Sequence, residues 1–124
     1  MNAPSTVWQG AGRRIHMQEV GLRDGLQMEK AFVPPADKIA LCNALSASGL
    51  SKIEVTSFTS PTAIPALKDA EVVMREITRR PGTVYTALVP NLRGAERAIE
   101  SRTDELNLVT VSYTHLTLPT TPYV

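Results

Sequence analysis

The sequence predicts an α/β fold, the N-terminal half of a (β/α)8 TIM barrel with about four strands and three helices. Short apolar runs alternate with longer segments of helical periodicity, and the connections between them are a few residues long. This alternation is typical of a parallel sheet with right-handed crossovers. The expected strands centre near Met17, Val55, Ala87 and Leu108, close to the roughly 30 residues per unit of such a barrel. A doubly wound sheet is the alternative, although no GxGxxG motif follows the first strand.

The first strand and the first helix have clear boundaries. Residues 14–20, RIHMQEV, alternate between two faces and predict a strand that Gly21 ends. Residues 34–49 open with two prolines and close on Gly49, which is the punctuation of a helix. The residues expected to share one face are Ile15, Met17 and Glu19 in the strand and Ile39, Cys42 and Leu45 in the helix.

The rest of the pattern repeats this unit. Strands are expected over 52–58, 83–89 and 104–109, and helices over 64–80 and 91–101. The longer helix ends in basic residues, which favour a helix C-terminus, before a Pro-Gly pair. The residues expected on the buried faces of these two helices are Leu67, Ala70, Met74 and Ile77, then Leu92, Ala95 and Ile99.

The two ends of the chain differ from this pattern. Residues 1–12 are small, polar or Gly-rich and predict a flexible arm ahead of a partial barrel domain over 13–109. Residues 110–124 contain no charged side chain and interrupt the pattern where a helix is expected. They can be back-translated into the end sequence of a transposon-based sequencing adapter. We therefore interpret them as a non-native tail and do not take His115 as a metal ligand.

Composition excludes several classes of protein. Thirteen basic and twelve acidic side chains give a net charge of +1 without a basic block, which argues against nucleic acid as a partner. No segment approaches the roughly 18 apolar residues of a membrane helix, and no secretion signal is evident, so we expect a cytoplasmic protein without a membrane partner. The single cysteine, Cys42, excludes an internal disulfide and fits a reducing compartment.

The segment VGLRDGLQ places Arg23 and Asp24 between two glycines at the end of the first strand. A surface ion pair contributes only about 0 to 1 kcal/mol, so stability alone is a poor reason for this arrangement. In α/β folds, ligands bind at the C-terminal ends of the strands. Asp24 is therefore a candidate ligand for a hard divalent cation, and Arg23 is a candidate for neutralising a developing enolate or carboxylate oxygen. The alternative is a surface turn.

Glu54 lies inside the apolar run KIEVTSF, where strict alternation puts it on one face with Lys52 and Thr56. Burying a carboxylate is costly unless it is paired, so we expect a partner, either Arg23 or a neighbouring lysine. The alternative is a solvated edge position.

The other candidate residues carry weaker signals. Gln27 either hydrogen-bonds a substrate or caps the loop, and Ser57 and Thr59 either lie near the site or belong to a plain loop. Cys42 is expected in the core, because it lies on the apolar face of its helix. His16 lacks a spaced partner, so ordinary packing is expected.

Three linked motifs resemble the hydroxymethylglutaryl-CoA lyases, which are metal-dependent TIM-barrel enzymes whose first strand ends in an Arg-Asp signature. The motifs are EVGLRDGLQMEK, GLSKIEVTSF with SP shortly after, and ALVPNLRGAERA, and the likeness runs from about Ile15 to Val109. The resemblance implies retro-Claisen cleavage of a 3-hydroxy-3-methylacyl-CoA to acetyl-CoA and a keto acid such as acetoacetate, in leucine degradation. It also implies Mg²⁺ or Mn²⁺ as the cofactor, an acyl-CoA substrate and a homo-oligomeric intact enzyme.

The same resemblance assigns roles to individual residues. Asp24 would be a metal ligand, and Arg23 would bind the substrate and stabilise the enolate. Gln27 would lie close to both, and Glu54 would be the active-site glutamate. The family's His-x-His ligands, mobile-loop cysteine and late asparagine ligand have no counterpart in this sequence. The chain is therefore expected to be an inactive N-terminal fragment of an active enzyme.

Two alternative functions stay open. One is a Claisen-condensing synthase of the isopropylmalate or homocitrate type, which typically reads TLRDGxQ where this chain reads VGLRDGLQ. The other is a small non-catalytic α/β binding module, which requires the last fourteen residues to be genuine.

Overall fold

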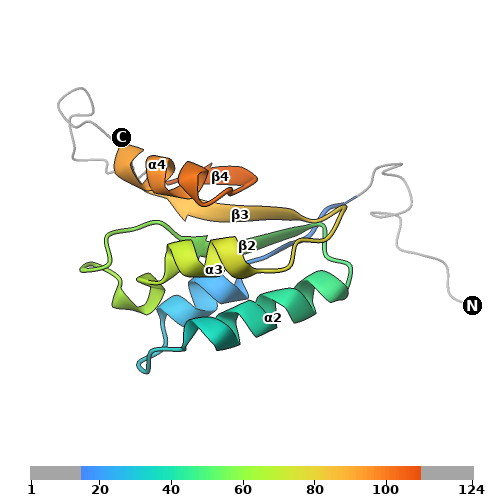
Figure 1. The fold of residues 1–124 in the computed structure, drawn as a ribbon, viewed down its shortest axis with the longest axis horizontal. Coiled ribbons are helices and arrows are strands. Elements are labelled where there is room, and N and C mark those ends of the chain that lie inside the picture. Colours follow the sequence, from blue (N-terminus) through green and yellow to red (C-terminus); the bar gives the residue numbers. More distant parts are fainter. Residues whose placement is uncertain (1–14, 110–124) are drawn as a thin grey trace, which may run out of the picture.

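A computed structural model describes residues 15–109 of the chain. The predicted arm (1–12) and the predicted tail (110–124), which includes His115, lie outside the described residues. The first two residues of the predicted partial domain, 13 and 14, also lie outside them. The described strands form one parallel sheet in the order β1, β2, β3, β4 (Figure 1). The strands are β1 (Gln18–Glu19), β2 (Lys52–Ser57), β3 (Val84–Val89) and β4 (Glu105–Leu108). The helical elements are η1 (Gly21–Gly25), α2 (Pro35–Ala47), η2 (Pro65–Leu67), α3 (Ala70–Glu76) and α4 (Leu92–Glu100).

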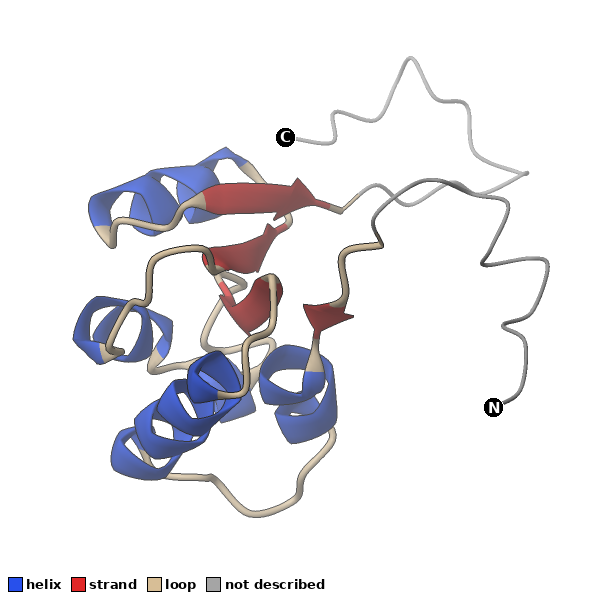
Figure 2. Cartoon of the chain, turned by 90° about the vertical axis from the view of Figure 1, so that its right-hand side faces the viewer, coloured by secondary structure: helices blue, strands red, loops and turns tan. Residues whose placement is uncertain are grey.

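The helices lie on one side of a curved row of strands (Figure 2). A doubly wound sheet would carry helices on both faces, whereas a barrel carries them only on its outside. The strand order equals the chain order, as expected for consecutive barrel units. The described residues therefore confirm the predicted α/β barrel fragment. No helix within residues 15–109 is long and apolar enough to cross a membrane.

The first strand is shorter than predicted, because only Gln18 and Glu19 pair with β2. Residues 15–17 precede this pairing and are exposed. The prediction that His16 packs in the ordinary way is wrong, since its side chain is exposed and Nδ1 lies 3.3 Å from Ser51 Oγ. In the described part of the sheet β1 is an edge strand, so it has a partner strand on one side only.

The helix predicted over 64–80 is broken into η2, a turn and the shorter α3. At its end, Ile77 adopts extended backbone geometry (φ −67°, ψ 151°). The next residue, Thr78, donates its backbone N–H to Asn43 Oδ1 at 2.8 Å, so α2 satisfies this amide and the helix can end. The predicted burial is nevertheless confirmed for Leu67, Ala70, Met74 and Ile77.

The buried face of α4 differs from the predicted one. Leu92 and Ile99 are each 65% exposed, whereas Gly94 and Ala98 are buried. Ala95 is only partly buried against the core. Small side chains allow the helix backbone to approach its neighbours closely, and this close approach determines which face is buried.

A β-bulge changes the face that the end of β2 presents. Glu54 pairs with Thr86, but Thr56 pairs with Ala87, the very next residue of β3. Residues in register share a face of a sheet and successive residues alternate. The prediction that Thr56 shares the face of Glu54 is therefore wrong, and Ser57 takes that position. Bulges bend strands and are common next to active sites.

Candidate active site

The site begins in η1, a single π-helical turn at the carboxyl end of β1. The carbonyl of Val20 accepts the backbone N–H groups of Arg23 at 3.1 Å and Asp24 at 2.7 Å. Leu22 is buried in the core and fixes the turn on the fold. The Gly21 N–H donates to Glu19 Oε1 at 2.9 Å, and a Cβ at position 21 would lie 2.8 Å from this oxygen, so a larger residue here would displace the Glu19 side chain. Single π-helical turns are rare and occur frequently at functional sites.

Arg23 pairs with Glu54, and of the two partners expected for this carboxylate, Arg23 or a neighbouring lysine, the structure shows Arg23. Arg23 Nε donates to Glu54 Oε1 at 2.6 Å, and the side chains are 19% and 4% exposed. Such a shielded, charge-assisted hydrogen bond fixes both groups more firmly than a surface pair would. The surface-turn interpretation of Arg23 and the solvated-edge interpretation of Glu54 are therefore wrong.

Three more polar residues complete a hydrogen-bonded network around Glu54. Glu54 Oε2 accepts from Asn107 Nδ2 at 2.7 Å and from Gln18 Nε2 at 3.4 Å. The same two amides donate to Thr86 Oγ1 at 3.2 Å and 3.0 Å. The network thus spans β1, β2, β3 and β4. Our sequence analysis missed Gln18, Thr86 and Asn107, although each is a polar residue inside a predicted strand, the signal that identified Glu54.

The carboxylate of Asp24 faces a different environment. Its side chain is 60% exposed, and Oδ1 lies 3.3 Å from Arg23 Nη1. Within residues 15–109, no group of three or more His, Cys, Asp and Glu side chains could hold a metal ion. Asp24 therefore fits one ligand position of a divalent cation, and the described residues do not supply a complete site.

The side-chain oxygen of Gln27 makes no hydrogen bond to this network in the described part of the chain. Gln27 lines a cavity of about 430 Å³ together with Lys30, Phe32 and the segment 63–66. Its Oε1 atom is buried without a hydrogen-bond partner among the described residues, so it does not cap the loop through this oxygen. A ligand N–H or O–H group would satisfy it.

Ser57, Thr59 and Cys42 have no part in the Glu54 network. The side-chain oxygens of Ser57 and Thr59 are buried without partners in the described structure. Cys42 is fully buried in the core, as predicted. Burial raises the pKa of its thiol to about 11, which excludes it as a nucleophile at neutral pH.

The chain is similar in sequence and in fold to known lyases. Over 93 residues the chain is 50% identical to hydroxymethylglutaryl-CoA lyase YngG of Bacillus subtilis, covering 75% of this chain and 31% of the relative. Over 94 residues it is 48% identical to the 3-hydroxy-3-isohexenylglutaryl-CoA/hydroxymethylglutaryl-CoA lyase of Pseudomonas aeruginosa, covering 76% and 31%. The solved HMG-CoA lyase from Acinetobacter baumannii, in complex with coenzyme A and 3-methylmalate, matches with 54% identity and a TM-score of 0.72, covering 73% of this chain and 30% of that structure.

The chain thus spans about a third of the length of these relatives. A family model described as HMGL-like matches residues 14–121, which is most of the sequence and runs past the boundary predicted at 109. The motifs, the fold and these matches agree, and the chain belongs to the HMGL-like family.

Proposed function

We propose that the full-length protein carrying this chain cleaves 3-hydroxy-3-methylglutaryl-CoA into acetyl-CoA and acetoacetate. The observation that carries the proposal is Arg23, held by the buried Glu54 at the carboxyl edge of a parallel sheet. This arrangement lies in a chain about half identical to hydroxymethylglutaryl-CoA lyases. The relatives from Bacillus subtilis and Pseudomonas aeruginosa are lyases, which favours this function over a condensing synthase.

The reaction is a retro-Claisen cleavage. A base removes the proton of the 3-hydroxyl group, and the carbon-carbon bond next to it breaks. The oxygen becomes the ketone of acetoacetate, and the electron pair of the broken bond passes to the enolate of acetyl-CoA. That enolate then takes up a proton on carbon. The site must therefore stabilise a negative oxygen that exists only after the bond has begun to break.

Arg23 fits this requirement. Its guanidinium stays charged and carries five fixed donors, of which Nε is used on Glu54 and Nη1 on Asp24. Nη2 makes no hydrogen bond within the described residues, so its donors are free for an enolate oxygen. Preorganised donors of this kind typically contribute about 10²- to 10³-fold to turnover.

Glu54 acts on Arg23 rather than on the substrate. Both of its oxygens already accept hydrogen bonds, Oε1 from Arg23 and Oε2 from Asn107 and Gln18. A carboxylate whose two oxygens already accept hydrogen bonds is a poor proton acceptor, but it holds the guanidinium of Arg23 in a fixed position. The general base of the reaction would therefore come from outside the network.

A divalent cation, Mg²⁺ or Mn²⁺, would be held partly by Asp24. When bound, it would polarise the hydroxyl and carbonyl oxygens of the substrate and lower the hydroxyl pKa. Asp24 is suited to it because its carboxylate is exposed and, among residues 15–109, makes a hydrogen bond to Arg23 alone. Hard oxygen ligands are those that both ions prefer.

The substrate class follows from the relatives. The Acinetobacter baumannii structure holds coenzyme A, and the Pseudomonas aeruginosa relative also acts on a longer isohexenyl chain. An acyl-CoA with a branched 3-hydroxy acyl group is therefore the proposed substrate. A cytoplasmic location and a homo-oligomeric state belong to the same proposal.

The test is an assay of the purified full-length protein with 3-hydroxy-3-methylglutaryl-CoA, following acetoacetate. We expect cleavage that a chelator abolishes and that added Mg²⁺ or Mn²⁺ restores. A matched control is 3-methylglutaryl-CoA, which lacks the hydroxyl group and should not be cleaved. If no acetoacetate forms with either metal, the proposed function is wrong.

A further inference from the structure

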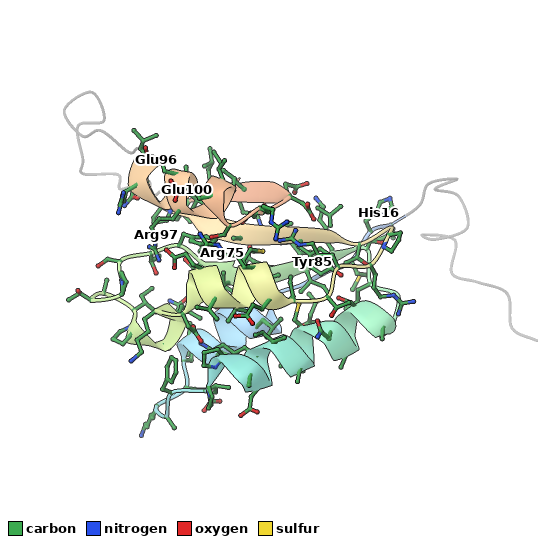
Figure 3. All side chains as sticks on the ribbon, viewed as in Figure 1. His16, Arg75, Tyr85, Glu96, Arg97 and Glu100 are labelled. Carbon is green, nitrogen blue, oxygen red and sulfur yellow. The ribbon has the colours of Figure 1, made fainter. Side chains whose placement is uncertain are left out.

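Arg97 on α4 contacts α3 and the β2 loop, which we define as residues 58–61. Its Nε and Nη2 donate to the carboxylate of Glu71 on α3 at 2.5 Å and 2.9 Å. Its Nη1 donates to the backbone carbonyl of Thr59 at 3.0 Å. The guanidinium also lies 5.4 Å from the centre of the Phe58 ring. Figure 3 shows Arg97 in the space between α4 and α3.

The first turn of α4 also contacts the β2 loop directly. A Cβ atom on Gly94 would lie 2.5 Å from the carbonyl oxygen of Phe58, a distance that real Cβ atoms essentially never show. The Gly94 N–H donates to the helix-capping Asn91 Oδ1 at 2.8 Å, which fixes this turn in place. Two successive carbonyls of the loop are thus held by α4, one by contact and one by a hydrogen bond.

Arg97 and Glu71 shift each other's pKa. The Arg97 guanidinium lowers the pKa of the Glu71 carboxyl, and this carboxylate raises the pKa of Arg97. Both groups therefore stay charged at neutral pH. The planar guanidinium of Arg97 donates to the Glu71 carboxylate and to the Thr59 carbonyl at the same time. A lysine ammonium cannot place its donors in this geometry.

The β2 loop is continuous with the candidate active site. The backbone N–H of Phe58 donates to the carbonyl of Leu88 at 2.9 Å, so sheet pairing extends into the first residue of the loop. The strand that precedes it carries Glu54, which holds Arg23. A displacement of the loop would therefore move the end of β2. A misplacement of about 1 Å can cost roughly 100-fold in rate, even when the change is remote from the chemistry.

We propose that Arg97 is a positioning residue for the reaction. Through the Thr59 carbonyl and the Phe58 ring it fixes the β2 loop, and with it the strand end that carries Glu54. This inference rests on the lyase function proposed above. Glu71 only strengthens the contact between α3 and α4, so the two partners of one ion pair should differ in their effect on catalysis.

The test compares Arg97→Met with Glu71→Gln in the full-length protein, because both remove the same ion pair and only the first removes the loop contact. We expect kcat/KM to fall about tenfold or more in Arg97→Met and to stay within about threefold of wild type in Glu71→Gln. Arg97→Lys should be intermediate, since its ammonium can still donate to the Thr59 carbonyl. The thermal unfolding midpoint of each variant is measured to check that all variants are equally folded at the assay temperature.

Hydrogen exchange provides a readout that does not depend on catalysis. The backbone amide of Phe58, which donates to the Leu88 carbonyl, should exchange faster in Arg97→Met than in Glu71→Gln. Equal exchange and equal kcat/KM in these two variants would overturn the proposal and leave Arg97 as a contact between helices. Wild-type protein that does not cleave the substrate would overturn the proposed function instead, while the exchange comparison would still decide the role of Arg97.

Discussion

Arg23 and Asp24 are adjacent in the sequence but occupy different environments. The side chain of Arg23 is 19% exposed and bonded to a buried glutamate, whereas that of Asp24 is 60% exposed. The π-helical turn produces this difference, because the buried Leu22 fixes its orientation. One residue is thereby held rigidly for electrostatic stabilisation, and the other is left accessible to a cation.

Asp24→Asn should weaken metal binding by the full-length protein. The amide keeps an oxygen ligand but loses the negative charge that a hard cation requires, so we expect the affinity for Mn²⁺ to fall about 10- to 100-fold. Titration with Mn²⁺ followed by electron paramagnetic resonance measures this without reference to turnover. Glu29→Gln, an exposed carboxylate shortly after the same turn, is the matched control. Equal affinity of Asp24→Asn and wild type would exclude Asp24 as a ligand.

Part of this site could be predicted from the sequence. A carboxylate in an apolar strand requires a partner, and this requirement narrowed the partner of Glu54 to Arg23 or a neighbouring lysine, of which the structure shows Arg23. The roles of Gln18, Thr86 and Asn107 depend on the pairing register of strands that are far apart in the sequence. Register is a property of the folded sheet, so these three residues could not be brought together beforehand.

Asn107→Asp should destabilise the protein in a pH-dependent way. The substitution places a second carboxylate beside Glu54 in place of an amide donor at 2.7 Å. We expect the free energy of unfolding at pH 7 to fall by about 1–3 kcal/mol. Repulsion would raise the pKa of the pair in the folded state, so the lost stability should return as the pH falls toward 4.

Chemical denaturation between pH 4 and pH 8 tests this prediction. Asn107→Ala is the control, because it removes the donor without adding charge and its loss should not shrink at low pH. A loss for Asn107→Asp that is the same at all pH values would contradict the account of the network.

At the scale of elements, the sequence predicted which residues of the 64–80 segment are buried better than it predicted where the helices begin and end. All four residues expected on the inner face around α3 are buried, although the helix is interrupted by a turn and ends early. Its end depends on a side chain of α2, Asn43, which no local pattern reveals. The inner face of α4 was predicted wrongly because apolar periodicity favours large residues. Here the close approach of the β2 loop requires glycine instead.

Cys42 on α2 provides a prediction for the packing of this helix. The thiol is fully buried, and its pKa is raised from an ordinary value of 9.0 to about 11. Iodoacetamide at pH 8 should therefore react with the unfolded protein but scarcely with the folded one. Stability should be lost as the pH rises from about 9 toward about 11, because the unfolded thiol ionises first.

Alkylation rates with and without denaturant, followed by mass spectrometry, measure the protection. Cys42→Ala is the control, since it removes the thiol that is alkylated and, with it, the loss of stability between pH 9 and pH 11. Rapid alkylation of the folded protein would show that α2 does not pack as described.

At the scale of the molecule, the described part is a segment of a curved sheet with helices on its outer side (Figure 2). Within that part β1 and β4 each have one strand neighbour, and Leu108 on β4 is 74% exposed. A barrel would cover both edges with further strands. Reading the genomic frame beyond codon 109 tests the predicted boundary of the natural sequence. A continuation into further βα units and a His-x-His pair is expected, and a genuine stop near residue 124 would contradict it.

In the proposed reaction Arg23, held by Glu54, stabilises the negative charge released when the carbon-carbon bond breaks. The most direct measurement is the turnover of 3-hydroxy-3-methylglutaryl-CoA by full-length wild type and Arg23→Met, with circular dichroism to compare their folded fractions. We expect turnover to fall by about 10²- to 10³-fold while substrate binding changes far less. Turnover of folded Arg23→Met equal to that of wild type would contradict the claim.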